Sequence, residues 1–197
     1  PSSCPVGRAF VLWWEPKNVL AQRCPSKGVK MLFKRVVFSL GLFFVAAQSH
    51  AGDANRAFAA AQGGDFDTAL TEWMPLAEQG FARAQYNVGV MHEMGEGVAK
   101  YYKTAIKWYT LAAEQGYTFA QYNLALKFFK GEGVAKDPES AVKWYKLAAE
   151  QGHVKSQYNL AVIYDTGDGI PEDNAAALKW YTQAANRGHV KAQYNLG

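Results

Sequence analysis

The chain has 197 residues, of which 49% are hydrophobic and 19% are charged, a composition typical of one ordinary folded domain. Its formal net charge of +4 would favour an anionic partner, but residues 1–51 hold 7 of the 21 Lys and Arg residues and only one acid, Glu15. Residues 52–197 therefore hold 14 basic and 16 acidic residues, a net charge of −2, which removes the compositional support for nucleic-acid binding.

Residues 1–30 show no periodic pattern. They begin with Pro1 rather than Met and contain both cysteines of the chain, Cys4 and Cys24. A translated leader of this length would hinder the signal peptide that follows, because such a signal acts from the N-terminus. We therefore expect translation to begin at Met31 and residues 1–30 to be an untranslated leader. The mature protein would then lack cysteine, which excludes disulfides and thiolate metal sites.

Residues 31–51 have the pattern of a cleaved secretory signal peptide. Lys34 and Arg35 supply the positive start, residues 36–47 are apolar, and Ser49-His50-Ala51 ends in the small residues that a signal peptidase requires. The apolar stretch is shorter than the roughly 20 residues that a membrane span needs. We expect a periplasmic or secreted protein with no stable membrane anchor after cleavage.

Residues 53–80 predict a shortened helical unit at the start of the mature chain. The sequence favours a helix from Ala54 to Gln62, a break at Gly63-Gly64-Asp65 and a second helix from Phe66 to Gln79. Trp73 is interpreted as the counterpart of the tryptophans of the later units. Pro75 predicts a kink in the second helix.

The rest of the chain is built from near-copies that recur every 36 residues. An Ala-x-x-Gly segment begins at Ala77, Ala113, Ala149 and Ala185; Gln-Tyr-Asn begins at Gln85, Gln121, Gln157 and Gln193; Trp-Tyr begins at Trp108, Trp144 and Trp180. A fixed period of this size is typical of a solenoid, in which each unit buries its apolar face against the next. We predict an all-α superhelix of about four stacked helix pairs over residues 52–197.

Each unit is expected to hold two helices, 82–94 and 103–115 in the first complete copy. The loop Gly95-Glu96-Gly97-Val98 joins them and recurs as Gly131-Glu132-Gly133-Val134 and Gly167-Asp168-Gly169-Ile170. Its glycines end the first helix, and its apolar residue is expected to turn inward. A phosphate-binding loop would need different spacing and a preceding strand.

The second helices differ in how they begin. Asp137-Pro138 and Asp173-Asn174 are good N-terminal caps, whereas Tyr101-Tyr102 offers no cap, so the second helix of the first complete unit is expected to fray more easily.

Helical spacing predicts the core. Ala84, Val88 and His92 form one stripe of the first helix, with Phe128 and Tyr164 in place of His92 in later units. Gly89 and its copies Ala125 and Ala161 would allow a neighbouring helix to approach closely, and Ala105, Tyr109 and Ala112 form the matching stripe of the second helix. We expect Trp108 and its copies to bury between successive units; an aromatic cage for a cationic ligand is the alternative.

These elements resemble those of the Sel-one-like repeat family, a branch of the tetratricopeptide-like helical solenoids. The resemblance covers residues 53–197 and rests on Ala84-Gln85-Tyr86-Asn87-Val88-Gly89, the Gly-x-Gly-Val loop, Trp144-Tyr145 and Ala148-Ala149-x-x-Gly152. Tyr101 in place of Asp departs from the pattern. The chain also stops in the middle of a repeat at Gly197, so we expect it to be truncated there. The resemblance implies a right-handed superhelix that binds proteins or peptides.

In tetratricopeptide-like folds, which this chain resembles, the first helix of each pair lines the concave face. The candidate peptide-binding residues are Arg83, Tyr86, Asn87, Phe119, Tyr122, Asn123, Lys155, Tyr158, Asn159, Lys191 and Asn195. An asparagine ladder could bond an extended peptide backbone, and the basic residues could meet acidic groups. The alternative is that the tyrosine and asparagine ladders hold one repeat to the next.

No constellation predicts catalysis, a metal or a cofactor. His153 and His189 sit at equivalent positions because of the repeat, and His92 replaces an aromatic core residue. Acids near the loops are interpreted as solvated surface: Glu93, Glu96, Glu132, Asp165 and Asp168. The sequence thus favours a non-catalytic adaptor of the bacterial envelope, or a secreted one. The alternatives are a repeat arm of an envelope or cell-wall hydrolase or binding protein whose catalytic part lies beyond residue 197, and an exported effector acting on a host cell.

Overall fold

The structure is a computed structural model that describes residues 55–196. The expectations for residues 1–30 and 31–51 lie outside this range. A helical segment over residues 55–62 is followed by eight helices: α2 (Phe66–Glu78), α3 (Ala82–Met94), α4 (Tyr102–Glu114), α5 (Thr118–Lys130), α6 (Pro138–Glu150), α7 (Val154–Thr166), α8 (Asn174–Asn186) and α9 (Val190–Leu196). The described residues contain no strand, so the predicted all-α class is confirmed.

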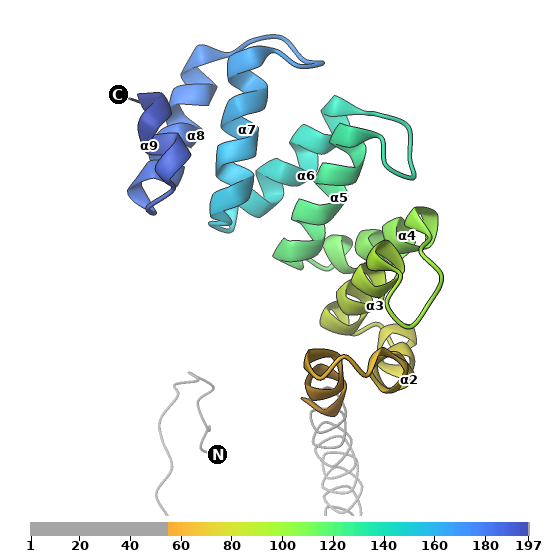
Figure 1. Ribbon diagram of the computed structural model, residues 1–197. Helices are drawn as coiled ribbons and strands as arrows, with labels where there is room; N and C mark the ends of the chain where they lie inside the picture. Colours follow the sequence, from red (N-terminus) through yellow and green to blue (C-terminus); the bar gives the residue numbers. More distant parts are fainter. Residues whose placement is uncertain (1–54, 197) are drawn as a thin grey trace, which may run out of the picture. The chain divides into compact units, whose positions relative to one another are not determined.

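The helices pack chiefly against their neighbours in sequence. The main pairs are α3 with α4, α5 with α6 and α7 with α8, and each pair packs on the next through α4 with α5 and α6 with α7. Figure 1 shows the pairs following one another in a curved row, with the loops inside each pair on its outer edge and the turns between pairs on its inner edge. This arrangement is the predicted solenoid.

The helix boundaries keep the repeat period. α2, α4, α6 and α8 begin at residues 66, 102, 138 and 174, steps of 36 residues. The predicted first helix, 82–94, matches α3, and the predicted second helix, 103–115, is α4 displaced by one residue. α2 continues through Pro75 to Glu78.

The helix starts show which caps the sequence supplies. The Asp137 carboxylate accepts from the backbone N–H of Ser140, and the Asp173 carboxylate accepts from Ala176, as predicted. Tyr101 makes no side-chain cap, also as predicted. His153 caps α7 by accepting from the N–H of Ser156 through Nδ1, a role that the sequence analysis did not foresee.

The second glycine of each loop packs on the preceding unit. Gly133 has a φ of +78°, and a Cβ atom there would collide with Tyr102 at the start of α4. Gly169 meets Pro138 at the start of α6 in the same way. Val98 and Ile170 are partly buried against core clusters, as expected for residues that hold the loop inward.

The predicted core stripes are buried except at the third position of the first helix, where His92, Phe128 and Tyr164 are only partly buried. Ala84, Val88, Ala105, Tyr109 and Ala112 are between 0% and 5% exposed. A Cβ atom on Gly89 would lie 2.7 Å from the Tyr109 ring, so glycine does permit the close approach of α3 and α4. Trp108, Trp144 and Trp180 pack against the hydrophobic clusters between units, with Trp180 most fully buried.

Trp73 is not the counterpart of Trp108, and this interpretation was wrong. The 36-residue step from Trp73 leads to Tyr109, and both side chains are buried on the core stripe of their helices. The N-terminal unit therefore carries an indole where the later units carry a phenol.

A row of buried glutamines ties the units together. Gln85 and Gln121 each donate through Nε2 to a backbone carbonyl at the end of the preceding unit, Ala77 and Ala113, at 3.1 Å. Each also accepts from the glutamine that ends its own unit, Gln115 or Gln151, at 2.7 Å. Gln85 of α3 therefore connects the ends of α2 and α4, and Gln121 of α5 connects the ends of α4 and α6.

That row is interrupted in the third complete unit. Gln157 still donates to the carbonyl of Ala149. Arg187 stands where the earlier units have Gln115 and Gln151, and it donates instead to the carbonyl of Gly152. The buried Oε1 of Gln157 consequently has no hydrogen-bond partner.

Candidate binding surface

Five aromatic side chains form a continuous surface across α3, α5 and the start of α7. We call Tyr86, Tyr117, Phe119, Tyr122 and His153 the aromatic surface. Ring centroids lie 5.2 Å apart for Tyr86 and Tyr117, 5.9 Å for Tyr117 and Phe119, 5.6 Å for Phe119 and His153, and 4.8 Å for His153 and Tyr122. Tyr117 and His153 belong to the turns that precede α5 and α7, and Figure 1 shows these turns on the inner edge of the row.

The aromatic surface is partly open to solvent. Phe119 is 51% exposed, while Tyr86 and Tyr122 are half-buried. Each of these two tyrosines leans on a buried tyrosine of the following helix, Tyr109 or Tyr145, with centroids 5.8 and 5.9 Å apart. The tyrosine rings are thus held in place by the core, while about half of the Phe119 ring stays exposed to solvent.

The pattern continues at the C-terminal end. Tyr158 rests on Tyr181 at 6.0 Å and stacks on His189 at 4.4 Å. The predicted tyrosine ladder therefore exists, and a histidine of the next turn covers two of its members, a contact that the sequence analysis missed.

The predicted asparagine ladder makes contacts inside the solenoid. Asn159 donates to the Tyr145 hydroxyl at 3.3 Å. Asn123 interacts with the hydroxyls of Tyr86 and Tyr109, and Asn195 with that of Tyr181. These contacts support the alternative that the asparagines hold repeat to repeat, and peptide binding by them stays a prediction.

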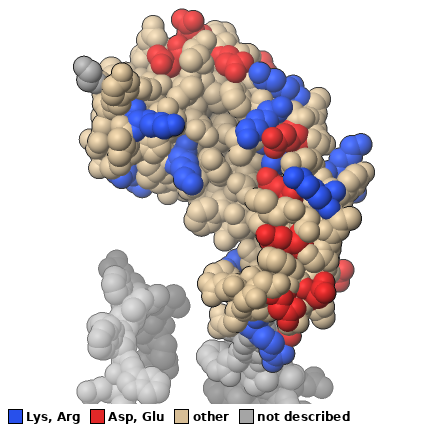
Figure 2. Space-filling model, in the orientation of Figure 1, with Lys and Arg blue, Asp and Glu red and all other residues tan. Residues whose placement is uncertain are grey.

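The predicted basic residues are exposed but do not form one patch. The Arg83 guanidinium lies over the Phe58 ring at 5.4 Å, while Lys155 and Lys191 are exposed on α7 and α9. Lys155 lies near His153, whose pKa is lowered first by burial and then by this positive charge. Figure 2 shows charged side chains concentrated along the outer edge, where the loops lie, and few on the inner edge.

The interpretation of the loop acids as solvated surface was wrong for Glu93 and Glu132, which pair with a buried lysine, whereas Asp165 is exposed as expected. Lys127 of α5 is only 2% exposed and pairs with Glu93 at 2.5 Å and with Glu132 at 2.6 Å. Glu93 also accepts from the Tyr109 hydroxyl at 2.6 Å, and Asp165 accepts from Tyr181 at 3.1 Å.

Lys127 can stay charged although it is buried, because its two carboxylate partners stabilise the ammonium group by more than burial destabilises it. Burial by itself lowers the pKa of Lys127, but hydrogen bonds to Glu132 and Glu93 raise the pKa above its ordinary value. The Lys127 ammonium in turn lowers the pKa of Glu132. The equivalent residues, Met91 and Ile163, are buried apolar side chains, so this network is specific to one junction.

The histidines serve packing and capping. His153 and His189 each accept a backbone N–H through Nδ1, and His92 is half-buried with its Nδ1 unpaired. Between residues 55 and 196, no three His, Cys, Asp or Glu side chains are placed to hold a metal ion. None of the helices in that range is long and apolar enough to cross a membrane.

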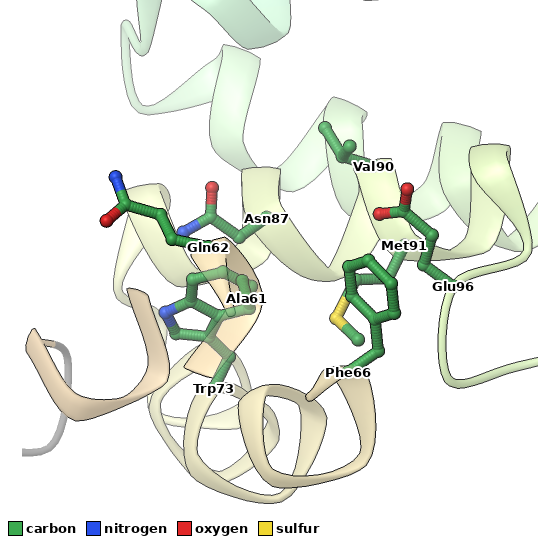
Figure 3. A pocket seen from close by; sticks show the side chains of 8 residues that line it. All are labelled: Ala61, Gln62, Phe66, Trp73, Asn87, Val90, Met91 and Glu96. Carbon is green, nitrogen blue, oxygen red and sulfur yellow. The ribbon is translucent and has the colours of Figure 1, made fainter. Parts of the chain in front are cut away.

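A pocket of about 290 Å³ opens beside the N-terminal unit. Figure 3 shows its apolar side chains, Ala61, Phe66, Trp73, Val90 and Met91, and its polar ones, Gln62, Asn87 and Glu96. Asn87, one of the predicted site residues, therefore lies at this pocket.

Comparison with known proteins agrees with this architecture. The Sel1 repeat family matches residues 82–117, 118–153 and 154–189, more than half of the chain. Comparison with curated proteins gives no match.

Two solved structures are similar in sequence and fold. A Sel1 repeat protein from Oxalobacter formigenes has 35% identity and a TM-score of 0.69 over 73% of this chain and 59% of its own. The protein c5321, a protective antigen of uropathogenic Escherichia coli strains with an SLR fold, has 34% identity and a TM-score of 0.70 over 78% of this chain and 34% of its own. The chain thus spans less than two thirds of either relative. Sel1 repeat proteins are generally protein-interaction scaffolds, and with three matched repeats and the predicted helix-pair solenoid this chain belongs to the Sel1 repeat family.

Proposed function

We propose that the protein is a non-catalytic adaptor that binds a protein or peptide in the bacterial envelope or outside the cell. Family membership supports protein binding as the general role. The observation that carries the proposal is the aromatic surface, in which the half-exposed Phe119 ring is surrounded by rings that the core holds in place. Exposed aromatic anchors of this kind often dominate the binding energy of protein interfaces.

Capture of partners by the purified chain tests the proposal. Phe119→Ala should reduce capture from an envelope extract at least tenfold, because a central aromatic anchor commonly contributes more than about 2 kcal/mol to binding. Leu178→Ala is the matched control, since Leu178 is 59% exposed on α8, away from the aromatic surface. Equal capture by wild type and Phe119→Ala would remove the aromatic surface from the proposal.

The asparagine ladder can be assigned by a double substitution, Asn123→Ala with Asn159→Ala. Because both amides contact tyrosine hydroxyls, we expect a loss of about 1–2 kcal/mol in the free energy of unfolding. Thermal unfolding and partner capture are measured together. Lost capture with an unchanged melting temperature would instead assign the asparagines to the partner.

Residues 31–51 support the proposed location. A fusion of the chain to alkaline phosphatase, which is active only after export, should be active, and removal of residues 31–51 should abolish that activity. A full-length fusion that stays in the cytoplasm and is inactive would contradict the location without bearing on partner binding.

A further inference from the structure

We infer that the pocket of the N-terminal unit binds a primary ammonium group, the side-chain tip of a lysine in a partner polypeptide. The inference rests on the proposed function for the source of that lysine. The choice of an ammonium group follows from the next repeat, where the Lys127 ammonium of the protein itself occupies the corresponding position.

The next repeat provides the template. There the Lys127 ammonium lies 2.6 Å from Glu132 and 2.5 Å from Glu93. It also lies over the Tyr102 ring, 4.9 Å from the centroid. A carboxylate and an aromatic face together stabilise a cation that has left water.

The pocket keeps this ring and one of these carboxylates but lacks the lysine. A step of 36 residues back from Glu132 leads to Glu96, from Tyr102 to Phe66 and from Lys127 to Met91. Glu96 and Phe66 both line the pocket. Within residues 55–196, Glu96 has no ion-pair partner, whereas the equivalent acids, Glu132 and Asp168, pair with lysines.

The space for an external group comes from two smaller or differently shaped residues. Ala61 stands two residues before the loop glycine Gly63, as Glu93 stands before Gly95, so a methyl group replaces a carboxylate arm. Trp73 replaces Tyr109, so the hydroxyl that bonds Glu93 is also missing. Figure 3 shows the resulting opening between the Phe66 and Trp73 rings, with the Glu96 carboxylate at its edge.

An ammonium group fits this pocket better than an apolar group. An apolar occupant would cover Glu96 without pairing it, and an unpaired charge that loses water is costly. A lysine offers a long apolar stem for the Val90 and Met91 side chains together with a cation for Glu96. Asn87, which lines the pocket, belongs to the face of α3 predicted to bind peptides, so a chain along that face can reach the pocket with a side chain.

The test is a titration of the full chain with lysine blocked at both ends as N-acetyl-lysine methylamide. The signal of the Trp73 indole N–H in a nitrogen–proton NMR spectrum reports the pocket, and that of Trp180 serves as a reference because it lies in the last complete unit. We expect saturable shifts of the Trp73 signal with a Kd of about 1 mM, the range for a ligand this small. Blocked norleucine, which has an apolar chain of similar length, should bind at least tenfold more weakly; equal or tighter binding would overturn the ammonium assignment.

Two variants check that binding depends on the pocket. Glu96→Gln should weaken blocked lysine about tenfold, the value of a charge-assisted hydrogen bond, while Asp168→Asn, at the equivalent loop position of the third repeat, should leave it unchanged. Met91→Lys should abolish binding by recreating the Lys127 arrangement in the pocket. If Met91→Lys fails to fold, Glu96→Gln still decides: unchanged affinity would overturn the inference.

The source of the ammonium is tested separately. Pentylammonium has the lysine chain without a backbone and should bind as blocked lysine does. Binding of pentylammonium without binding of blocked lysine would overturn the polypeptide source. Failure of the capture experiment with Phe119→Ala concerns the aromatic surface and leaves these pocket measurements intact, so the two failures are distinguishable.

Discussion

The buried ion pairs of Lys127 predict an unequal response to removing each partner. Glu93→Gln keeps the size of the side chain and an acceptor for the Tyr109 hydroxyl, but it removes one of the two negative charges that pair with Lys127. Lys127→Met places at this position the residue that the preceding unit has at Met91. The first change leaves a buried cation with one partner, whereas the second removes the buried charge.

The magnitudes follow from exposure. Removing one member of a fully buried ion pair costs about 3–5 kcal/mol. Because Glu132 remains as a second partner, we expect Glu93→Gln to lower the free energy of unfolding by about 2 kcal/mol. In Lys127→Met the freed carboxylates, Glu93 and Glu132, are 16% and 34% exposed and can reach water, so we expect a change within about 1 kcal/mol in either direction.

Urea unfolding followed by circular dichroism at pH 7 and at pH 4 measures both variants. Lys127 holds the pKa of Glu132 below its ordinary value of 4.5, so wild-type stability should be intact above that value and fall as the pH drops through the lowered pKa. Lys127→Met should lack this fall. If Lys127→Met proves less stable than Glu93→Gln at pH 7, the reasoning is wrong and the ion pairs contribute more than apolar packing would.

Three further predictions follow from the packing. Gly133→Ala should lower the free energy of unfolding by about 2–3 kcal/mol, because the new Cβ atom would collide with Tyr102 and alanine is strained at a positive φ. Gly116 has a similar φ but lies in open space, so Gly116→Ala should cost only about 1 kcal/mol. Equal losses in urea unfolding would argue against the contact between the loop and Tyr102. Because burial lowers the pKa of His153, the stability of the wild type should fall as the pH drops from 6.5 through that lowered pKa. His153→Asn keeps a side-chain cap but cannot take up a proton, so it should remove this pH dependence. The same pH profile in the variant and the wild type would refute the role of His153. Arg187→Gln should supply the missing partner of Gln157, so we expect the free energy of unfolding to rise by about 0.5–1 kcal/mol and the melting temperature to rise with it. A lower melting temperature would show that the hydrogen bond from Arg187 to the Gly152 carbonyl contributes more.

The period, the helix boundaries and the caps at Asp137 and Asp173 could be predicted because they depend on local sequence. Helix starts need a side-chain acceptor next to free N–H groups, and glycine spacing marks the loops. Trp73 was matched to Trp108 because both residues are tryptophans, although a step of 36 residues leads from Trp73 to Tyr109. Counting places it on the core stripe, where its bulk belongs.

The site was harder to predict because residue type is a poor guide to burial at a junction between units. Lysine is ordinarily a surface residue, and only the partners from α3 and from the following loop make the buried position of Lys127 acceptable. The asparagines were candidates for partner contact, with contacts between repeats as the alternative. A helical wheel could not decide between the two, because it does not show that a tyrosine hydroxyl from the neighbouring helix lies within reach of Asn159. His153 was likewise seen as a product of duplication, although its position directly before a helix was a signal for capping.

The glutamine row has a consequence for how such a chain changes in length. Each glutamine bonds to the end of the unit before it and to the end of its own unit, so the connections across a junction come from the repeat sequence itself. A duplicated or deleted 36-residue segment would therefore bring or remove a complete set of junction bonds and leave every other junction as it was. The number of units, and with it the reach of the inner edge, can vary in whole steps by recombination within the gene, without a new core having to be found each time.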